Sequence, residues 1–243
     1  MTTNQTSGRR GLVWAVAGGL VLIAGIVAIL VSSLLAQPTP SPSGSPSEPP
    51  PSSTPTADAP VGAIVDASVV EQGWLAEPIT TDREVYIRAA LEAASSFDTQ
   101  LSTREEWLDY LDTWFTPDTR YAETERDARM KAAQLELRQG VVLPQEEWDS
   151  LANEDGRVVA VTTGEVVYVP VTDDASGDMS IGTSDVTLTF TRSDGSGGET
   201  SYEEQVRVSV QVLCGSGSVP TSDSAQRAGD CKVVRYFTEP LEP

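Results

Sequence analysis

The chain has 243 residues and a formal net charge of −20 at pH 7, and it contains no histidine. Residues 1–60 are neutral overall, so the excess of acid lies in residues 61–243, which hold 34 Asp plus Glu against 14 Lys plus Arg. Such a surface repels phosphate backbones, which disfavours direct nucleic-acid binding. The lack of histidine removes the commonest general base and metal ligand, which counts against an enzyme and against a metal site.

Residues 11–36 form an apolar run of 26 residues without a charge. At 1.5 Å per helical residue, this run exceeds the roughly 30 Å hydrocarbon core of a bilayer. Arg9 and Arg10 precede it, and the next cationic residue is Arg83. The positive-inside rule therefore predicts a single-pass transmembrane helix at 11–36, with residues 1–10 in the cytoplasm and the rest of the chain outside the cell membrane.

A cleaved signal peptide is the alternative interpretation of this run. The run is about twice as long as a usual signal-peptide core, and Leu34-Leu35-Ala36 lacks the small residue expected three positions before a cut. The sequence therefore favours an uncleaved anchor.

Residues 37–60 are rich in proline and serine and contain nine of the sixteen prolines. Such a segment cannot bury a core and favours an extended polyproline chain of up to about 3.1 Å per residue. We interpret it as a disordered linker. The remaining residues, 61–243, are enough for one extracytoplasmic domain.

Two capping signals predict the first helices of this domain. Thr81-Asp82-Arg83-Glu84 matches a capping box, and apolar residues then recur at every fourth position: Val85, Ala89, Ala93 and Phe97. Tyr86, Ala90 and Ala94 widen this stripe. Ser102-Thr103-Arg104-Glu105 opens a second helix, which Thr116-Pro117 ends. Large apolar residues share one face of that helix: Trp107, Leu108, Leu111, Trp114 and Phe115. We expect Phe97 and this face to form core, or the wall of a pocket.

Residues 118–139 predict a third helix that ends at Gly140, and Pro144 starts a short further one. The third helix carries the one concentration of basic residues in the outer domain: Arg120, Arg126, Arg129, Lys131 and Arg138. Acidic residues interleave with them, a pattern typical of a solvated, ion-paired face.

From Gly156 onward, β-branched residues dominate. Strands are expected at 157–162 continuing through 165–171, and at 185–192, 202–214 and 231–237. Strict alternation in two of these segments indicates strands with one buried face. Helices followed by strands predict an α+β domain in which helices pack on a roughly four-stranded antiparallel sheet.

The two cysteines lie at the ends of predicted strands, Cys214 closing one and Cys231 opening the next. Outside the membrane thiols tend to oxidise, so we expect a structural disulfide between them. In the chain-entropy model, a loop of this size contributes about 3 kcal/mol.

No motif in the sequence assigns catalytic, cofactor-binding or metal-binding residues. There is no Gly-x-Ser-x-Gly elbow and no Ser-x-x-Lys pair. Asp173, Asp174 and Asp178 lack the spacing of an EF-hand, so a flexible polar loop is the preferred interpretation. Abundant carboxylates make close acidic pairs inevitable, so such pairs are weak evidence for catalysis. We therefore expect no cofactor.

The layout resembles the nuclear transport factor 2-like fold, as used by bitopic assembly subunits of type IV secretion and Gram-positive conjugation machines. The helix carrying Phe97, the helix from Ser102 to Pro117 and the valine-rich strands carry the likeness, which covers residues 80–237. It is a likeness of layout rather than of a motif. The same layout occurs in membrane proteins associated with lipid import in actinobacteria, and the high Arg-to-Lys ratio is compatible with that group. These families have no catalytic residues to carry over.

Three hypotheses follow from the sequence. The leading one is a non-enzymatic, membrane-anchored assembly component of a conjugation or secretion complex. Its partners would be other envelope proteins, and further copies of this chain in a homo-oligomer are an additional option, whereas direct nucleic-acid binding is not expected. The second is a tethered ligand-binding or sensory domain, which predicts an open apolar cavity beside Trp107 and Trp114. The third is an enzyme, which needs buried carboxylates converging in a pocket.

Overall fold

The structure is a computed structural model that describes residues 62–242. The predicted cytoplasmic segment, transmembrane helix and linker (1–10, 11–36 and 37–60) lie outside the described residues. Within the described part, no helix combines the length and apolar character needed to cross a membrane.

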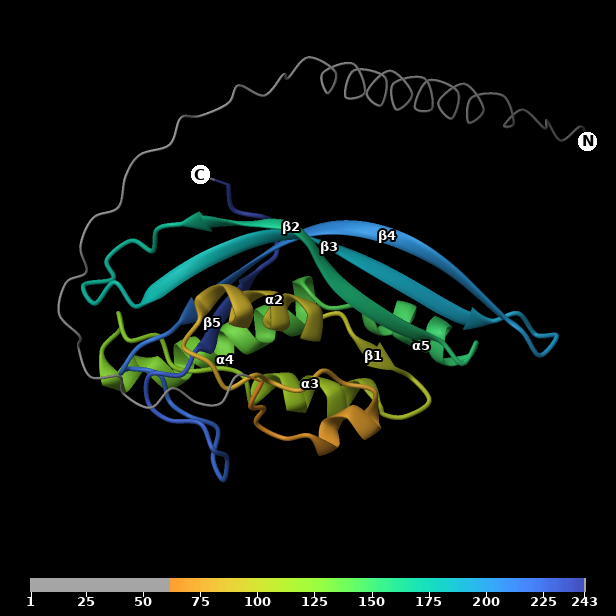
Figure 1. Ribbon diagram of the computed structural model, residues 1–243, viewed down its shortest axis with the longest axis horizontal. Coiled ribbons are helices and arrows are strands. Elements are labelled where there is room, and N and C mark those ends of the chain that lie inside the picture. Colours follow the sequence, from red (N-terminus) through yellow and green to blue (C-terminus); the bar gives the residue numbers. More distant parts are fainter. Residues whose placement is uncertain (1–61, 243) are drawn as a thin grey trace, which may run out of the picture. The chain divides into compact units, whose positions relative to one another are not determined.

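Five antiparallel strands form one curled sheet in the order β1-β2-β3-β4-β5 (Figure 1). The strands are β1 (Phe97–Asp98), β2 (Arg157–Val169), β3 (Met179–Ser193), β4 (Glu199–Leu213) and β5 (Lys232–Phe237). The predicted α+β class and antiparallel sheet are confirmed. The two-residue strand β1 extends the four long strands that the sequence indicated.

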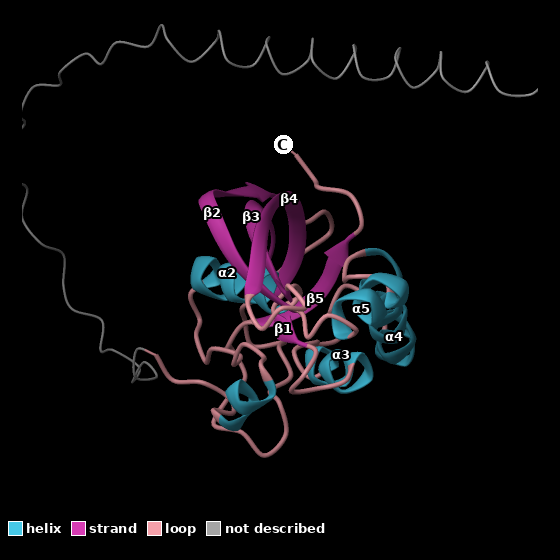
Figure 2. Cartoon of the chain, turned by 90° about the vertical axis from the view of Figure 1, so that its right-hand side faces the viewer, coloured by secondary structure: helices cyan, strands magenta, loops and turns pink. Residues whose placement is uncertain are grey.

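The helices lie on one side of this sheet, as the turned view shows (Figure 2). They are the short 3-10 helix η2 (Ser68–Gln72), α2 (Arg83–Ala93), α3 (Arg104–Asp112), α4 (Glu123–Gly140) and α5 (Gln145–Ala152). The core fills the space between helices and sheet, because the apolar faces of both layers must leave water.

Both capping signals mark real helix starts, but each cap is one residue later than predicted. Asp82, not Thr81, caps α2, because its carboxylate accepts from the backbone N–H groups of Glu84 (2.9 Å) and Val85 (3.2 Å). Thr103, not Ser102, caps α3 and forms a full capping box with Glu106. A side chain caps the helix from the position whose oxygen reaches the free N–H groups, and spacing alone does not decide between two adjacent candidates.

The predicted stripe on α2 is wrong at both ends. Val85 is 50% exposed, and α2 ends at Ala93, so Phe97 lies outside the helix and pairs with Val158 as a strand. The middle of the stripe is confirmed, since Tyr86, Ala90 and Ala93 are buried, and two residues that were not predicted extend it: Ile87 and Leu91.

Other boundaries shift for local reasons. The third helix starts at Glu123 instead of residue 118, since Asp118 closes a turn by accepting from the Arg120 N–H. The predicted end of this helix at Gly140 is confirmed. Strand β3 begins at Met179, six residues before the predicted start. The N-terminal half of this strand is buried but contains polar residues, so its sequence lacks the apolar alternation that predicts a strand. The hydroxyl groups of Thr183 and Ser209 satisfy each other there at 2.6 Å.

Candidate functional site

The aromatic face predicted from the sequence lies inside the core. Trp107, Leu111, Trp114 and Phe115 are buried in the main hydrophobic cluster, as is Phe97. Phe97 packs against the Trp107 ring with centroids 4.9 Å apart and is joined there by an aromatic residue of α5. The space beside Trp107 and Trp114 is therefore filled by neighbouring rings, which is a packed core rather than a cavity.

An apolar groove of about 390 Å³ lies elsewhere, between the end of α2, the α4–α5 turn and the helix-facing side of the sheet. Of the predicted aromatic face, Phe97 contributes to its wall. Side chains of the long β3–β4 hairpin form much of the rest, and Phe190 stacks on Tyr202 with centroids 4.9 Å apart. The lining residues that define this groove include Leu91, Val141, Leu143, Leu188, Val206 and Val208.

A buried polar cluster, which the sequence did not indicate, lies on the other side of the core. We call it the Glu77 cluster: Glu77, Tyr86, Thr221, Gln226 and Lys232. The Lys232 ammonium donates to the Glu77 carboxylate at 2.8 Å, and both side chains are 1% exposed. Tyr86 donates to the same carboxylate oxygen at 2.5 Å and Gln226 at 3.1 Å. Four separate parts of the chain therefore meet at one carboxylate.

The ammonium of Lys232 has its hydrogen-bonding capacity filled. Besides Glu77, it donates to the Thr113 carbonyl oxygen at 2.8 Å and to the Thr221 hydroxyl at 2.7 Å. Burial lowers the pKa of Lys232, while the charge of Glu77 opposes this shift. Burial, followed by the nearby Glu77 carboxylate, raises the pKa of Tyr86 well above its usual value. A satisfied, closed network of this kind holds segments together and leaves no group directed at a substrate.

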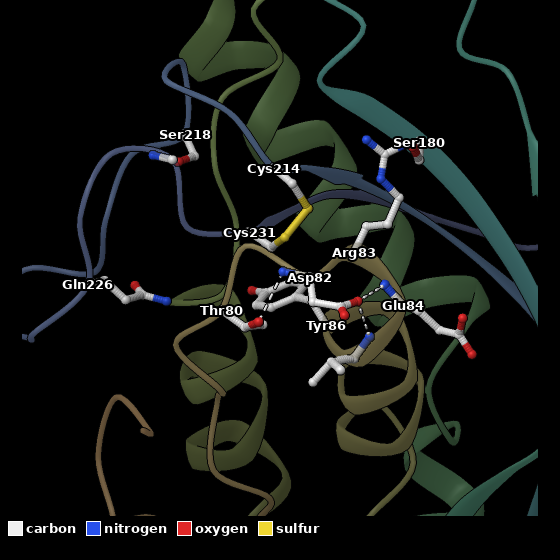
Figure 3. Close-up of a disulfide and its surroundings, with 12 residues drawn as sticks. Thr80, Asp82, Arg83, Glu84, Tyr86, Ser180, Cys214, Ser218, Gln226 and Cys231 are labelled. Carbon is white, nitrogen blue, oxygen red and sulfur yellow. Dashed lines mark hydrogen bonds between the residues drawn. A yellow bond between two sulfur atoms is a disulfide. The ribbon is translucent and has the colours of Figure 1, made fainter. Parts of the chain in front are cut away.

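The predicted disulfide between Cys214 and Cys231 is present, and Figure 3 shows it beside the start of α2. The Cys231 N–H donates to the Thr80 carbonyl oxygen at 2.8 Å, which ties the disulfide to the segment before that helix. The loop between the cysteines is held a second time by the Glu77 cluster through Gln226. The disulfide and the buried ion pair therefore act on the same loop, a structural role.

Metal ligation has no support in the described part of the chain. Among residues 62–242, no group of three or more His, Cys, Asp or Glu side chains is arranged to hold a metal ion. In the segment with Asp173, Asp174 and Asp178, the Asp174 carboxylate accepts from the Ser176 and Met179 N–H groups at 3.1 and 2.8 Å. This carboxylate closes a turn.

The sequence matches no protein-family model and has no significant match among curated proteins. Two solved structures are similar to this chain over about two thirds of its length. One is an IcmL-like type IV secretion system protein from Legionella pneumophila strain Philadelphia 1, at 12% identity over 67% of this chain and 95% of that chain, with a TM-score of 0.39. The other is CagV, a VirB8 homolog of the type IV secretion system of Helicobacter pylori strain 26695, at 12% identity over 65% and 96%, with a TM-score of 0.35.

Both solved structures belong to the class of protein that the sequence layout resembles, type IV secretion subunits.

Proposed function

We propose that this chain is a non-enzymatic, membrane-anchored assembly component of a conjugation or secretion-type envelope complex. Its N-terminus lies in the cytoplasm, and its outer domain contacts protein partners.

The observation that carries the proposal is the state of the buried ionisable groups. In the described domain, the buried Glu77 and Lys232 side chains form an ion pair with each other and hydrogen bonds with neighbouring hydroxyl, amide and carbonyl groups. The large aromatic residues are buried in the hydrophobic core. An enzyme keeps reactive groups poised in an accessible cavity, whereas a scaffold uses its interior for packing. The proposal also rests on the apolar run at 11–36, the proline-rich segment at 37–60 and the resemblance in layout.

Purification of the tagged chain from native membranes tests this proposal. We expect transfer or secretion subunits to co-purify with the full chain. A matched variant that ends at residue 61 retains the anchor and linker, and it should lose those partners. Recovery of the full chain without any such subunit would contradict the proposal, and equal recovery with both variants would show that the outer domain is not the contact.

The apolar groove favours a second candidate, an extracytoplasmic ligand-binding or sensory domain tethered to the membrane. Its volume of about 390 Å³ lies within the roughly 300–1,000 Å³ of small-molecule sites. The cavity expected for this function beside Trp107 and Trp114 is replaced by packed core, so the groove beside Phe97 is the site to test.

Anilinonaphthalene sulfonate, an anionic dye whose aromatic rings fluoresce on binding apolar surface, can probe this groove in the full chain. Leu188→Glu places a charge in the groove, whereas Val159→Glu places the same charge on the opposite face of the sheet, where Val159 is 52% exposed. Saturable binding that Leu188→Glu abolishes and Val159→Glu preserves would support the second candidate. Equal dye binding by the two variants would contradict the second candidate function.

A further inference from the structure

A hollow of about 190 Å³ lies between α4, β5 and the turn that precedes α4. Its polar wall consists of Arg120, Tyr121, Arg129 and Arg235, with Asp118 and Glu136 beside them. We call this the arginine hollow. It is smaller than the roughly 300–1,000 Å³ of sites for drug-sized ligands, so it suits a single side chain.

Two of the three arginines are fixed in place by bidentate ion pairs. Arg120 donates to both oxygens of Asp118, from Nε to Oδ1 at 3.0 Å and from Nη2 to Oδ2 at 2.6 Å. Arg235 donates to both oxygens of Glu136 at 2.7 and 2.9 Å. The guanidinium of Arg120 is close enough to oppose the rise that Glu136 causes in the pKa of Arg235. Each guanidinium has five N–H donors, so these pairs orient the groups and leave further donors for a ligand.

The third arginine is the one whose charge is not matched. The guanidinium of Arg129 lies over the Tyr121 ring, 4.6 Å from its centroid. Within residues 62–242, none of the ion pairs involves Arg129. Stacking on an aromatic ring uses the face of the guanidinium and leaves its N–H edge available for a planar acceptor.

The turn that supplies Tyr121 is held rigidly against α4. Arg126 donates to the carbonyl oxygens of Tyr121 and Thr119 at 3.0 and 3.3 Å. This anchoring fixes the ring on which Arg129 lies, so the hollow is formed before any ligand arrives. A preformed site avoids the entropy cost of ordering its side chains on binding.

The charge of the wall selects the ligand. The hollow is lined by three arginines and two carboxylates, so its local net charge is one positive charge. The chain as a whole carries a net charge of −20. A phosphate dianion would lie against the Asp118 and Glu136 carboxylates, whereas a single carboxylate matches the one free charge and the planar fork of Arg129. We propose that the arginine hollow binds a carboxylate side chain presented by an acidic segment of a partner protein. This inference does not depend on the secretion or conjugation assignment.

The test is a titration of the full chain in detergent micelles with a triglutamate peptide, followed by the NMR signals of the arginine Nε–H groups. Both peptides are acetylated and amidated at their termini, so that only side chains differ, and we expect saturable shifts for Arg120, Arg129 and Arg235 with triglutamate and none with triglutamine. Arg129→Gln should weaken binding, as reported by Arg235, by about tenfold, because it removes the unmatched charge and its fork. Arg129→Lys should give an intermediate loss, because it keeps the charge without the fork.

Lys131→Gln is the matched control, since it removes the same charge from an exposed position of α4 that does not line the hollow. It should change the affinity by less than about twofold, because its charge lies outside the hollow and reaches a bound carboxylate only through water. Equal losses in Arg129→Gln and Lys131→Gln would overturn the proposal. So would equal shifts with triglutamine, or tighter binding of inorganic phosphate at the same signals.

Discussion

Replacement of Lys232 by methionine tests whether the Glu77 cluster holds the fold together. Methionine has a similar length and no charge, so the change removes the ammonium and its bonds to Glu77, Thr113 and Thr221 while it largely conserves volume. The Glu77 carboxylate is then buried without its counterion.

The expected loss is about 3 kcal/mol of unfolding free energy. Removal of one partner of a buried ion pair costs about 3–5 kcal/mol. The lower end applies because the Glu77 carboxylate still accepts from Tyr86 at 2.5 Å and from Gln226 at 3.1 Å, and Thr221 lies at 3.4 Å. Urea unfolding of the full chain in detergent, followed by tryptophan fluorescence, measures the change. Lys131→Met is the control, and as an exposed substitution it should cost less than about 0.5 kcal/mol.

A double-mutant cycle separates the ion pair from general disruption. Glu77→Gln keeps an oxygen that accepts from Tyr86, so the double variant Glu77→Gln/Lys232→Met contains no buried charge. We expect it to recover most of the stability, with a coupling energy of at least about 2 kcal/mol. A cost below about 1 kcal/mol for Lys232→Met alone would refute the reasoning, as would additive effects of the two changes.

Three further predictions concern other parts of the domain. Replacement of both Cys214 and Cys231 by alanine should lower the unfolding free energy by about 3 kcal/mol in a urea titration, because the unfolded loop regains its freedom, and an unchanged midpoint would contradict this. Burial, followed by the Glu77 carboxylate, raises the pKa of Tyr86 and Tyr236 in the folded state. Because the pKa of each tyrosine is higher in the folded state than the unfolded value of about 10, its neutral form stabilises the fold fully below pH 10 and this contribution is lost as the pH rises further. We therefore expect the domain to unfold when these two tyrosines ionise. Ultraviolet tyrosinate absorbance would contradict this if all six tyrosines ionised near pH 10 while the fold persisted. Gly182→Ala places a Cβ 2.6 Å from a side chain of α2 and should lower the unfolding free energy by about 1–3 kcal/mol, which thermal unfolding measures. An unchanged melting temperature would contradict this and would show that α2 can move to accommodate the Cβ.

Local chemistry explains the elements that the sequence predicted well. Helix-capping residues and 3.6-residue periodicity located the helices to within a few residues, and the alternation in 185–192 and 202–214 located β3 and β4. Boundaries moved where a side chain acted over two or three positions, as Asp82 does at the start of α2. The start of β3 was missed because its buried residues, such as Thr183, are polar and pair with hydroxyl groups across the sheet.

The Glu77 cluster and the arginine hollow had no comparable signal. Glu77 and Lys232 are 155 positions apart, and nothing in either neighbourhood indicates the other. The one local hint was a lysine within an apolar strand, next to Val233, where an unpaired charge would be costly. For the arginine hollow, the sequence indicated a solvated, ion-paired face on 118–139, but not the contribution of Arg235 from β5.

The sequence by itself determined the class of the domain, the order of its helices and strands and the pairing of its two cysteines. These properties depend on composition and on residues close together in the chain. Only the tertiary structure decided that Trp107 and Trp114 are core, that an apolar groove opens beside Phe97 and that Glu77 finds Lys232. Those outcomes depend on which distant surfaces the chain brings into contact, and burial then fixes their energies.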